Sequence, residues 1–163
     1  MPPNAELITR FYTAFQRLDP AGMKACYHAD AIFSDPVFPE LRGRQVGAMW
    51  TMLCAAAKDF ELTFSDVSAD DTRGSANWVA RYAFSKTGRK VTNRIHADFE
   101  FRDGLILRHR DTFNLHRWMG MALGPVGTLL GWLPPMQAKV RATAAVGLAK
   151  FIAAHPEYQI PSA

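Results

Sequence analysis

The chain has 163 residues, of which 48% are hydrophobic and 21% charged, so it suits one folded domain and excludes a disordered or fibrous protein. Its two cysteines are too few for a disulfide framework, and no Cys/His cluster has zinc-site spacing. The charge is uneven: residues 1–71 hold 6 Lys/Arg against 10 Asp/Glu, whereas residues 72–163 hold 13 against 5. A basic half is compatible with an anionic partner or with a solvated face.

Several function classes lack their sequence signatures. The dinucleotide, P-loop, nucleophile-elbow and HExxH patterns are all absent, so we expect neither a cofactor nor a metal. The basic residues do not cluster with stacking aromatics, which argues against a nucleic-acid partner. The first residues, MPPNAELITRF, lack the charged start and apolar run of a secretory signal, so the expected location is cytoplasmic.

Helical periodicity dominates the first third of the chain. Apolar residues at helical spacing predict a helix over 7–18 with Asn4 as its N-cap. Asp19 should cap a second short helix, and a third should follow Gly43. A short strand is expected over 31–37. The apolar residues assigned to the second helix are Met23, Cys26 and Tyr27.

From Phe60 onward the apolar period changes to two, which is typical of strands. The alternating runs cover 60–67, 76–84, 91–101 and 105–115. Helices followed by antiparallel strands predict an α+β class with helices over one face of a curved sheet. The arginines of these strands fall on the outward parity, so the positive charge belongs to the outer sheet face. They are Arg81, Arg94, Arg102, Arg108 and Arg110.

The last hairpin has a register that the apolar pattern favours. A three-residue loop at 102–104 puts the apolar side chains of both strands on one face. His109 and Asp111 then point inward, whereas His96 and Asp98 point outward. The two His-x-Asp pairs therefore cannot form a single metal site.

Residues 118–138 carry no charge, but their four glycines and three prolines argue against a membrane span. A segment capping the sheet or a dimer contact is the simpler interpretation, with a pocket lid or a membrane-surface contact as alternatives. The helical stripe that follows is Val140, Ala144, Leu148 and Phe151. We expect a cone domain over 1–117, with the capping segment and C-terminal helix, 118–163, packed on it.

Asp35 is the first candidate catalytic residue. It stands among aromatic and apolar neighbours in AIFSDPVF, where loss of hydration would raise its pKa and suit a general base. The alternative is a structural carboxylate that caps the turn before Pro36.

His109 and Asp111 are the other catalytic candidates. Two residues apart on one strand, they could act together as acid and base or as donor and orienter. The alternative is a buried polar pair satisfied by Tyr82, Asn93 or the backbone. The side chains expected to contact a substrate are Tyr12, Phe33, Trp50, Trp78, Tyr82 and Phe99.

Three segments carry a resemblance to the nuclear transport factor 2-like superfamily: YHADAIFSDPV (27–37), LRGRQVGAMW (41–50) and FEFRDGLILRHRDTFNL (99–115). Its members include ketosteroid isomerase, limonene-epoxide hydrolase and the SnoaL-like polyketide cyclases. The resemblance covers residues 4–117 and implies a cone-shaped fold. The tail RWMGMALGPVGTLLGWLPP (117–135) is similar to that of a bacterial subset of SnoaL-like proteins.

The resemblance also implies roles for single residues. Asp35 matches the proton-shuttling base of ketosteroid isomerase, an enzyme in which a neutral carboxylic acid donates a hydrogen bond to the oxyanion. The two oxyanion-binding positions of that enzyme are Phe11 and Ala97 here, which cannot donate. Asp111 matches a catalytic aspartate of limonene-epoxide hydrolase, whereas the other members of that triad fall at Trp78 and Ala80.

These residues together predict a cofactor-free isomerase or cyclase for a small hydrophobic carbonyl compound. Asp35 would remove a proton, and His109, oriented by Asp111, would polarise the carbonyl. The alternative is a non-catalytic module that binds a small hydrophobic ligand or supports assembly. The superfamily implies a homodimer.

Overall fold

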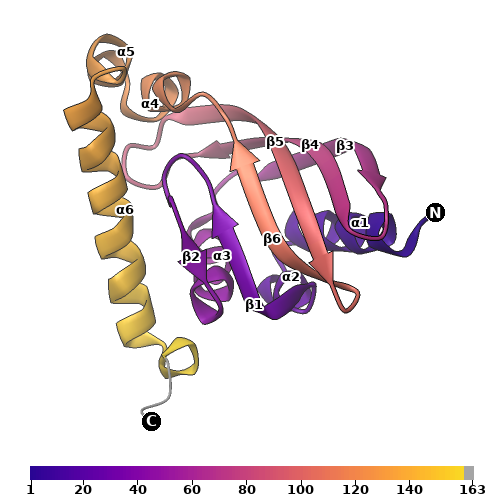
Figure 1. Ribbon diagram of the computed structural model, residues 1–163. Helices are drawn as coiled ribbons and strands as arrows, with labels where there is room; N and C mark the ends of the chain where they lie inside the picture. The colour runs from indigo at the N-terminus through magenta and orange to yellow at the C-terminus, as the bar shows by residue number, and fades with distance from the viewer. Residues whose placement is uncertain (160–163) are drawn as a thin grey trace.

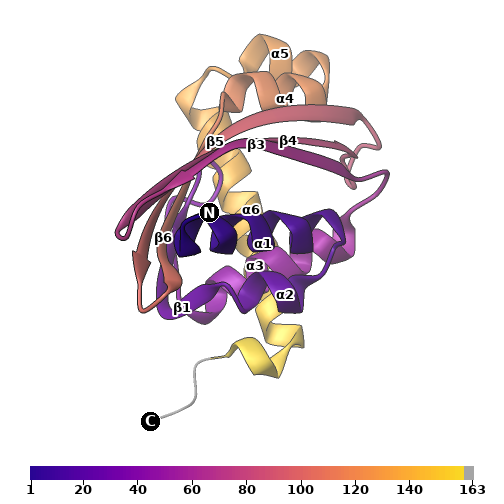
Figure 2. The same ribbon diagram turned by 90° about the vertical axis from the view of Figure 1, so that its right-hand side faces the viewer.

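The computed structural model describes residues 1–159 and has a curved mixed sheet with helices on one face and at one end (Figures 1 and 2). The N-terminal helices and first strands are α1 (Pro3–Gln16), α2 (Pro20–Lys24), β1 (Tyr27–Ser34), β2 (Leu41–Arg42) and α3 (Arg44–Ala56). The long strands are β3 (Glu61–Ala69), β4 (Arg73–Ala83), β5 (Lys90–Arg102) and β6 (Leu105–Thr112). The C-terminal elements are α4 (Leu115–Leu123), α5 (Pro125–Leu130), α6 (Pro134–Ala154) and the 3-10 turn η1 (Pro156–Tyr158). The expected α+β cone is confirmed.

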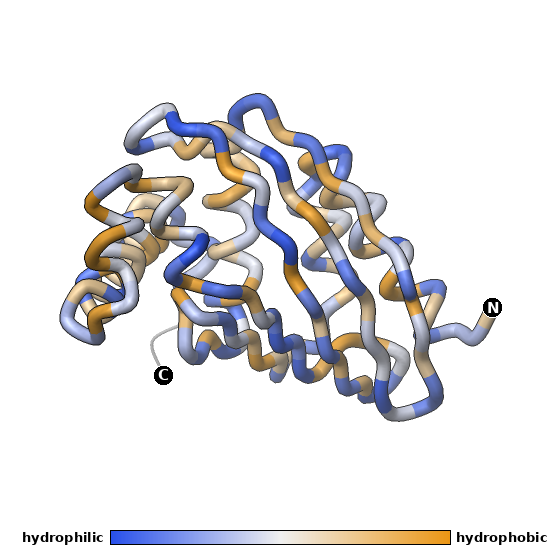
Figure 3. The backbone as a smooth tube through the Cα atoms, turned by 90° about the horizontal axis from the view of Figure 1, so that it is seen from above, coloured by the Kyte–Doolittle hydropathy of each residue, from blue (hydrophilic) through white to orange (hydrophobic). Residues whose placement is uncertain are grey.

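The sheet has the order β2-β1-β6-β5-β4-β3. Adjacent strands are antiparallel except β1 and β6, which run parallel. Parallel neighbours need a long connection, and here β2, α3 and β3 to β5 lie between the two strands in the sequence. Polar and apolar residues alternate along the long strands, as Figure 3 shows. The apolar face curves around α1, α2 and α3 (Figure 2). Helix α1 supplies Leu7, Ile8, Phe11, Tyr12 and Phe15 to this core.

The β5–β6 hairpin differs from the predicted register. Arg102 pairs with Leu105, so the loop has two residues, Asp103 and Gly104, and their φ angles of 54° and 73° suit a tight type I′ turn. Beyond Phe101 the register shifts by one residue, and Glu100 faces Arg108. This bulge restores the inward parity that a two-residue loop would otherwise have lost. The expected loop was wrong, but the expected faces are correct.

Two element boundaries also differ from expectation. Pro2 rather than Asn4 precedes the first helix, and the Asn4 amide instead donates to the carbonyls of Asp70 and Asp71 in the β3–β4 turn. Strand β1 begins at Tyr27, so that residue belongs to the sheet and not to the second helix. The Asp19 cap is confirmed, since its carboxylate accepts from the Gly22 amide.

The uncharged segment is divided among three helices. Gly124-Pro125 separates α4 from α5, and Pro134-Pro135 begins α6. Helix α6 crosses the end of the sheet remote from the N-terminus (Figure 1), and its Leu148 is buried as the predicted stripe requires. Arg141 Nε donates to the Pro36 carbonyl at 2.9 Å, which ties α6 to the loop after β1. Within residues 1–159, none of the helices combines the length and apolarity that crossing a membrane requires.

A glycine pair tests this packing. A Cβ on Gly127 would lie 2.0 Å from the Met119 carbonyl oxygen, because α5 rests directly on α4, whereas a Cβ on Gly147 in α6 meets nothing within 4 Å. We therefore expect Gly127→Ala to lower the free energy of unfolding by about 1–3 kcal/mol. Gly147→Ala should raise it by about 0.5–1 kcal/mol, the gain in helix propensity. Urea unfolding measures both, and equal effects would contradict the packing described.

Candidate active site

The β1–β6 pairing brings the three catalytic candidates to one end of the cone. Phe33 pairs with His109 and Ser34 with Arg110, so Asp35 follows directly beside Asp111. Sequence distance hides this proximity, because the two strands are separated by β2 to β5. The structure therefore brings Asp35, His109 and Asp111 into one neighbourhood.

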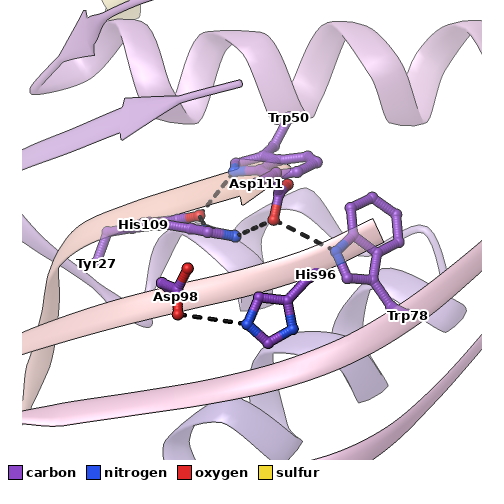
Figure 4. A network of polar contacts seen from close by, with 7 residues as sticks. All are labelled: Tyr27, Trp50, Trp78, His96, Asp98, His109 and Asp111. Atoms are coloured by element: carbon purple, nitrogen blue, oxygen red, sulfur yellow. Dashed lines mark hydrogen bonds and ion pairs between the residues drawn. The ribbon is translucent and has the colours of Figure 1, made fainter. Parts of the chain in front are cut away.

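His109 is held by hydrogen bonds at both ring nitrogens (Figure 4). Its Nδ1 lies 2.6 Å from the Tyr27 hydroxyl, and its Nε2 lies 2.9 Å from Asp111 Oδ1. Trp50 Nε1 donates to the Tyr27 oxygen at 2.9 Å, and Trp78 Nε1 approaches Asp111 Oδ1 at 3.4 Å. The imidazole side chain has no exposed surface and the Asp111 side chain retains 3%.

One proton arrangement satisfies every donor in this network. Burial raises the pKa of the Tyr27 hydroxyl well above its ordinary value of 10.0, so Tyr27 keeps its proton. Because its oxygen already accepts from Trp50, the hydroxyl donates to Nδ1 of His109. His109 is then a neutral imidazole whose Nε2–H donates to the Asp111 carboxylate. The chain of donors runs from Trp50 through Tyr27 and His109 to Asp111, and we call it the Tyr–His–Asp relay.

Aromatic rings enclose the imidazole. Their centroids lie between 4.5 Å (Phe99) and 6.1 Å (Tyr27) from the His109 centroid. The other rings are Phe11, Phe33 and Trp50. With both nitrogens occupied and the ring enclosed, His109 has no free donor for a substrate carbonyl. Its geometry fits a positioning residue for Asp111 better than the expected polarising group.

Asp35 has both the turn-cap contacts and the raised pKa that its sequence context suggested. Its Oδ1 accepts from the Val37 amide at 2.7 Å and the Phe38 amide at 2.6 Å, which is a turn cap. Burial nevertheless raises the pKa of this carboxyl from 3.8 to about 6, against the opposing effect of those amides. The negative charge of Asp111 raises this pKa further. Asp35 is thus a desolvated acid that ionises near neutral pH.

The residues expected to line a pocket are mostly packed against one another. Tyr12, Phe33, Trp50, Trp78 and Phe99 are all buried. Tyr82 is half-buried, and its oxygen accepts from Trp118 Nε1 at 2.8 Å. Two hollows open on the surface, of about 540 Å³ beside α4 and about 440 Å³ between α1 and α2. Neither is lined by any of the three catalytic candidates.

The Tyr12 hydroxyl is buried and has no hydrogen-bond partner. Burial is the largest cause that raises its pKa well above 10.0, and the charge of Asp111 adds to it. Tyr12 is therefore a protonated donor close to the relay, and its hydroxyl is not engaged by the protein. Such an orphan is rare in folded proteins and is a candidate ligand contact.

Tyr27 is the site residue that the sequence analysis missed. Its apolar neighbours place it on a helical stripe, and only the parallel pairing of β1 with β6 brings it to His109. The buried pair is satisfied by Tyr27 and Trp78, not by the expected Tyr82 or Asn93. Among residues 1–159 there is no group of three or more His, Cys, Asp or Glu side chains that could hold a metal ion.

Two Tyr→Phe variants compare the hydrogen-bonded hydroxyl of Tyr27 with the hydroxyl of Tyr12, which has no partner. Tyr27→Phe leaves Trp50 Nε1 and His109 Nδ1 without a partner, so the free energy of unfolding should fall by about 1–3 kcal/mol. Tyr12→Phe removes a hydroxyl that has no partner and should leave the stability unchanged or raise it. Urea unfolding at neutral pH compares the two. A Tyr27→Phe protein as stable as the wild type would contradict the relay.

Comparison with known proteins agrees with this architecture. The model of the SnoaL-like domain matches residues 8–109. No curated protein matches the sequence. Solved structures of the same fold include a candidate polyketide cyclase from a Silicibacter species, 23% identical over 72% of this chain and 93% of its own, with a TM-score of 0.65.

Two further structures show the range of proteins on this fold. An epoxide hydrolase of Mycobacterium tuberculosis, similar to limonene-epoxide hydrolase, is 20% identical over 81% of this chain and 96% of its own, with a TM-score of 0.63. TerC, crystallised with polyporic acid, is 18% identical over 74% and 98%, with a TM-score of 0.64. The domain match covers most of the cone from α1 into β6. The chain therefore belongs to the SnoaL-like family, on the nuclear transport factor 2-like fold.

Proposed function

We propose that this protein is a cofactor-free enzyme of the isomerase or cyclase type that acts on a small hydrophobic carbonyl compound. The observation that carries the proposal is the meeting of Asp35 and Asp111 at an apolar end of the cone. In these surroundings burial and the nearby charge of Asp111 raise the pKa of Asp35 to about 6, which suits acid and base chemistry near neutral pH. The polyketide cyclase and TerC structures on the same fold support a hydrophobic, oxygen-bearing substrate.

In this proposal Asp35 is the general base. Its carboxylate takes a proton from the carbon beside the carbonyl, which leaves an enolate, and then returns the proton to another atom of the substrate. The backbone amides of Val37 and Phe38 hold the carboxylate in place during both steps. The partial exposure of Asp35, Val37 and Tyr82 marks the side from which a substrate approaches.

The enolate oxygen needs a hydrogen-bond donor, and Tyr12 has the unengaged one. His109 does not contact the substrate; it fixes the orientation of the Asp111 carboxylate through Nε2. The negative charge on Asp111 raises the pKa of Asp35, which makes Asp35 a stronger base than an ordinary aspartate.

The second candidate function is a non-catalytic module that binds a small hydrophobic ligand. The close packing of His109 and its aromatic neighbours favours it, because a filled interior needs no chemistry to explain the buried polar pair. In that case hydrophobic ketones would bind without any change in their proton exchange.

Deuterium exchange distinguishes the two without knowledge of the natural product. Hydrophobic ketones are incubated with the protein in D₂O, and NMR follows exchange at the carbon beside the carbonyl. We expect exchange that Asp35→Asn lowers by at least about 100-fold. Because the base must be ionised, the rate should rise with pH through about 6 and then level off.

Asp103→Asn is the matched control, since Asp103 is exposed in the β5–β6 turn, where asparagine also tolerates a positive φ. It should leave the exchange rate unchanged. An Asp35→Asn protein that exchanges as fast as the wild type would refute the base assignment. Ketone binding with no exchange in the wild type would establish the binding module instead.

A further inference from the structure

Helix α5 forms an extremity of the molecule (Figures 1 and 2). Large apolar side chains of this helix and of the turn after it are exposed. Leu129 is 70% exposed and Trp132, just after the helix, is 62% exposed. Val126 and Leu130 are exposed as well. We call these four residues the apolar tip. A group of this kind at one extremity is a sign of an interaction surface, whereas scattered single residues are not.

The apolar tip is held rigidly despite its exposure. A Cβ on Gly127 would overlap the Met119 carbonyl of α4, so only glycine permits this close contact between the two helices. A Cβ on Gly131 would lie 2.3 Å from the Gly127 carbonyl oxygen, so the turn after α5 requires glycine as well. Trp132 Nε1 donates to the Leu129 carbonyl at 3.0 Å, which holds the indole next to the helix. The apolar side chains are therefore presented outward by the fold itself.

Basic residues lie directly beside the apolar tip. The hollow of about 540 Å³ is lined by Arg89 just before β5 and Lys90 at its start, by Arg117 of α4 and by Thr128 of α5. Arg89 Nε donates to the Met121 carbonyl at 3.0 Å, which fixes its guanidinium against α4. His116 lines the same hollow and donates from Nε2 to the Thr128 carbonyl at 2.7 Å.

No acidic residue offsets this charge. Residues 72–97, which include all of β4 and the β4–β5 turn, contain no Asp or Glu, and neither do residues 112–156. The residues that line the hollow beside the apolar tip all come from these two segments. On this side of the apolar tip, Asp and Glu are therefore absent and the charged side chains are basic.

We propose that this end of the protein docks on an anionic phospholipid surface. The apolar tip would enter the boundary between headgroups and acyl chains, while Arg89, Lys90 and Arg117 meet lipid phosphates. A second copy of the chain fits less well, because a two-fold contact at the tip would oppose two sets of these basic residues with no carboxylates between them. The protein would lie on the membrane, since α5 is far too short to cross it.

Trp132 provides a direct readout, because it is the exposed member of the four tryptophans. Wild-type protein is mixed at low salt with vesicles of phosphatidylserine and phosphatidylcholine, or with phosphatidylcholine alone. We expect co-sedimentation with the anionic vesicles only, together with protection of Trp132 from acrylamide quenching. Added salt should weaken the binding.

Variants on the exposed surface test the two components separately. Leu129→Ser should weaken vesicle binding by at least about tenfold through lost apolar burial. Lys90→Glu combined with Arg117→Glu should weaken it by at least about tenfold through charge reversal. Leu53→Ser, which changes an exposed leucine on α3, is the matched control and should bind as the wild type does.

Three results would overturn the proposal. One is the absence of binding to anionic vesicles at low salt. Another is equal binding to neutral vesicles, which would remove the role of the basic residues. The third is a lipid-free dimer that protects Trp132 from quenching and dissociates on Leu129→Ser, which would assign the apolar tip to a second copy of the chain.

Discussion

The buried imidazole of His109 connects more of this fold than any other polar side chain of the candidate site. Through Nδ1 it binds Tyr27 at the start of β1, and through Nε2 it binds Asp111 on its own strand β6. Trp50 of α3 and Trp78 of β4 donate to those two partners. The His109 ring and its partners therefore link α3, the parallel strands β1 and β6, and β4. Removal of any donor in this network would leave a buried polar group unpaired.

This constraint also determines the chemistry available at the site. His109 uses both nitrogens within the protein, so the proposed mechanism has it orient Asp111 and assigns the contacts with a substrate to Asp35 and Tyr12. Asp35 is held by two amides at the end of β1, where burial brings its ionisation near neutral pH. A packed aromatic interior makes each of these polar groups more effective, since little water competes for its hydrogen bonds.

Alternation along β6 was enough to predict that His109 and Asp111 face inward, because side-chain parity is a local property. The hairpin register was not predictable in the same way, since a bulge after a two-residue turn restores the same parity as a three-residue loop.

Tyr27 was missed because parallel pairing depends on the whole intervening chain. For Asp35, the turn cap is confirmed and the pKa is raised as its apolar neighbours predicted, whereas the base role stays a prediction. The outward parity predicted for the sheet arginines is confirmed by their exposure, and Arg108 pairs with Glu100 there.

The tautomer of His109 is the most direct test of this account, and ¹⁵N NMR of the imidazole at neutral pH measures it. The relay predicts a hydrogen on Nε2, coupled to Asp111, and an unprotonated Nδ1 that accepts from Tyr27. Tyr27→Phe should shift the Nδ1 resonance while Tyr12→Phe leaves it in place. A hydrogen on Nδ1, alone or in a doubly protonated ring, would contradict the donor order from Trp50 to Asp111.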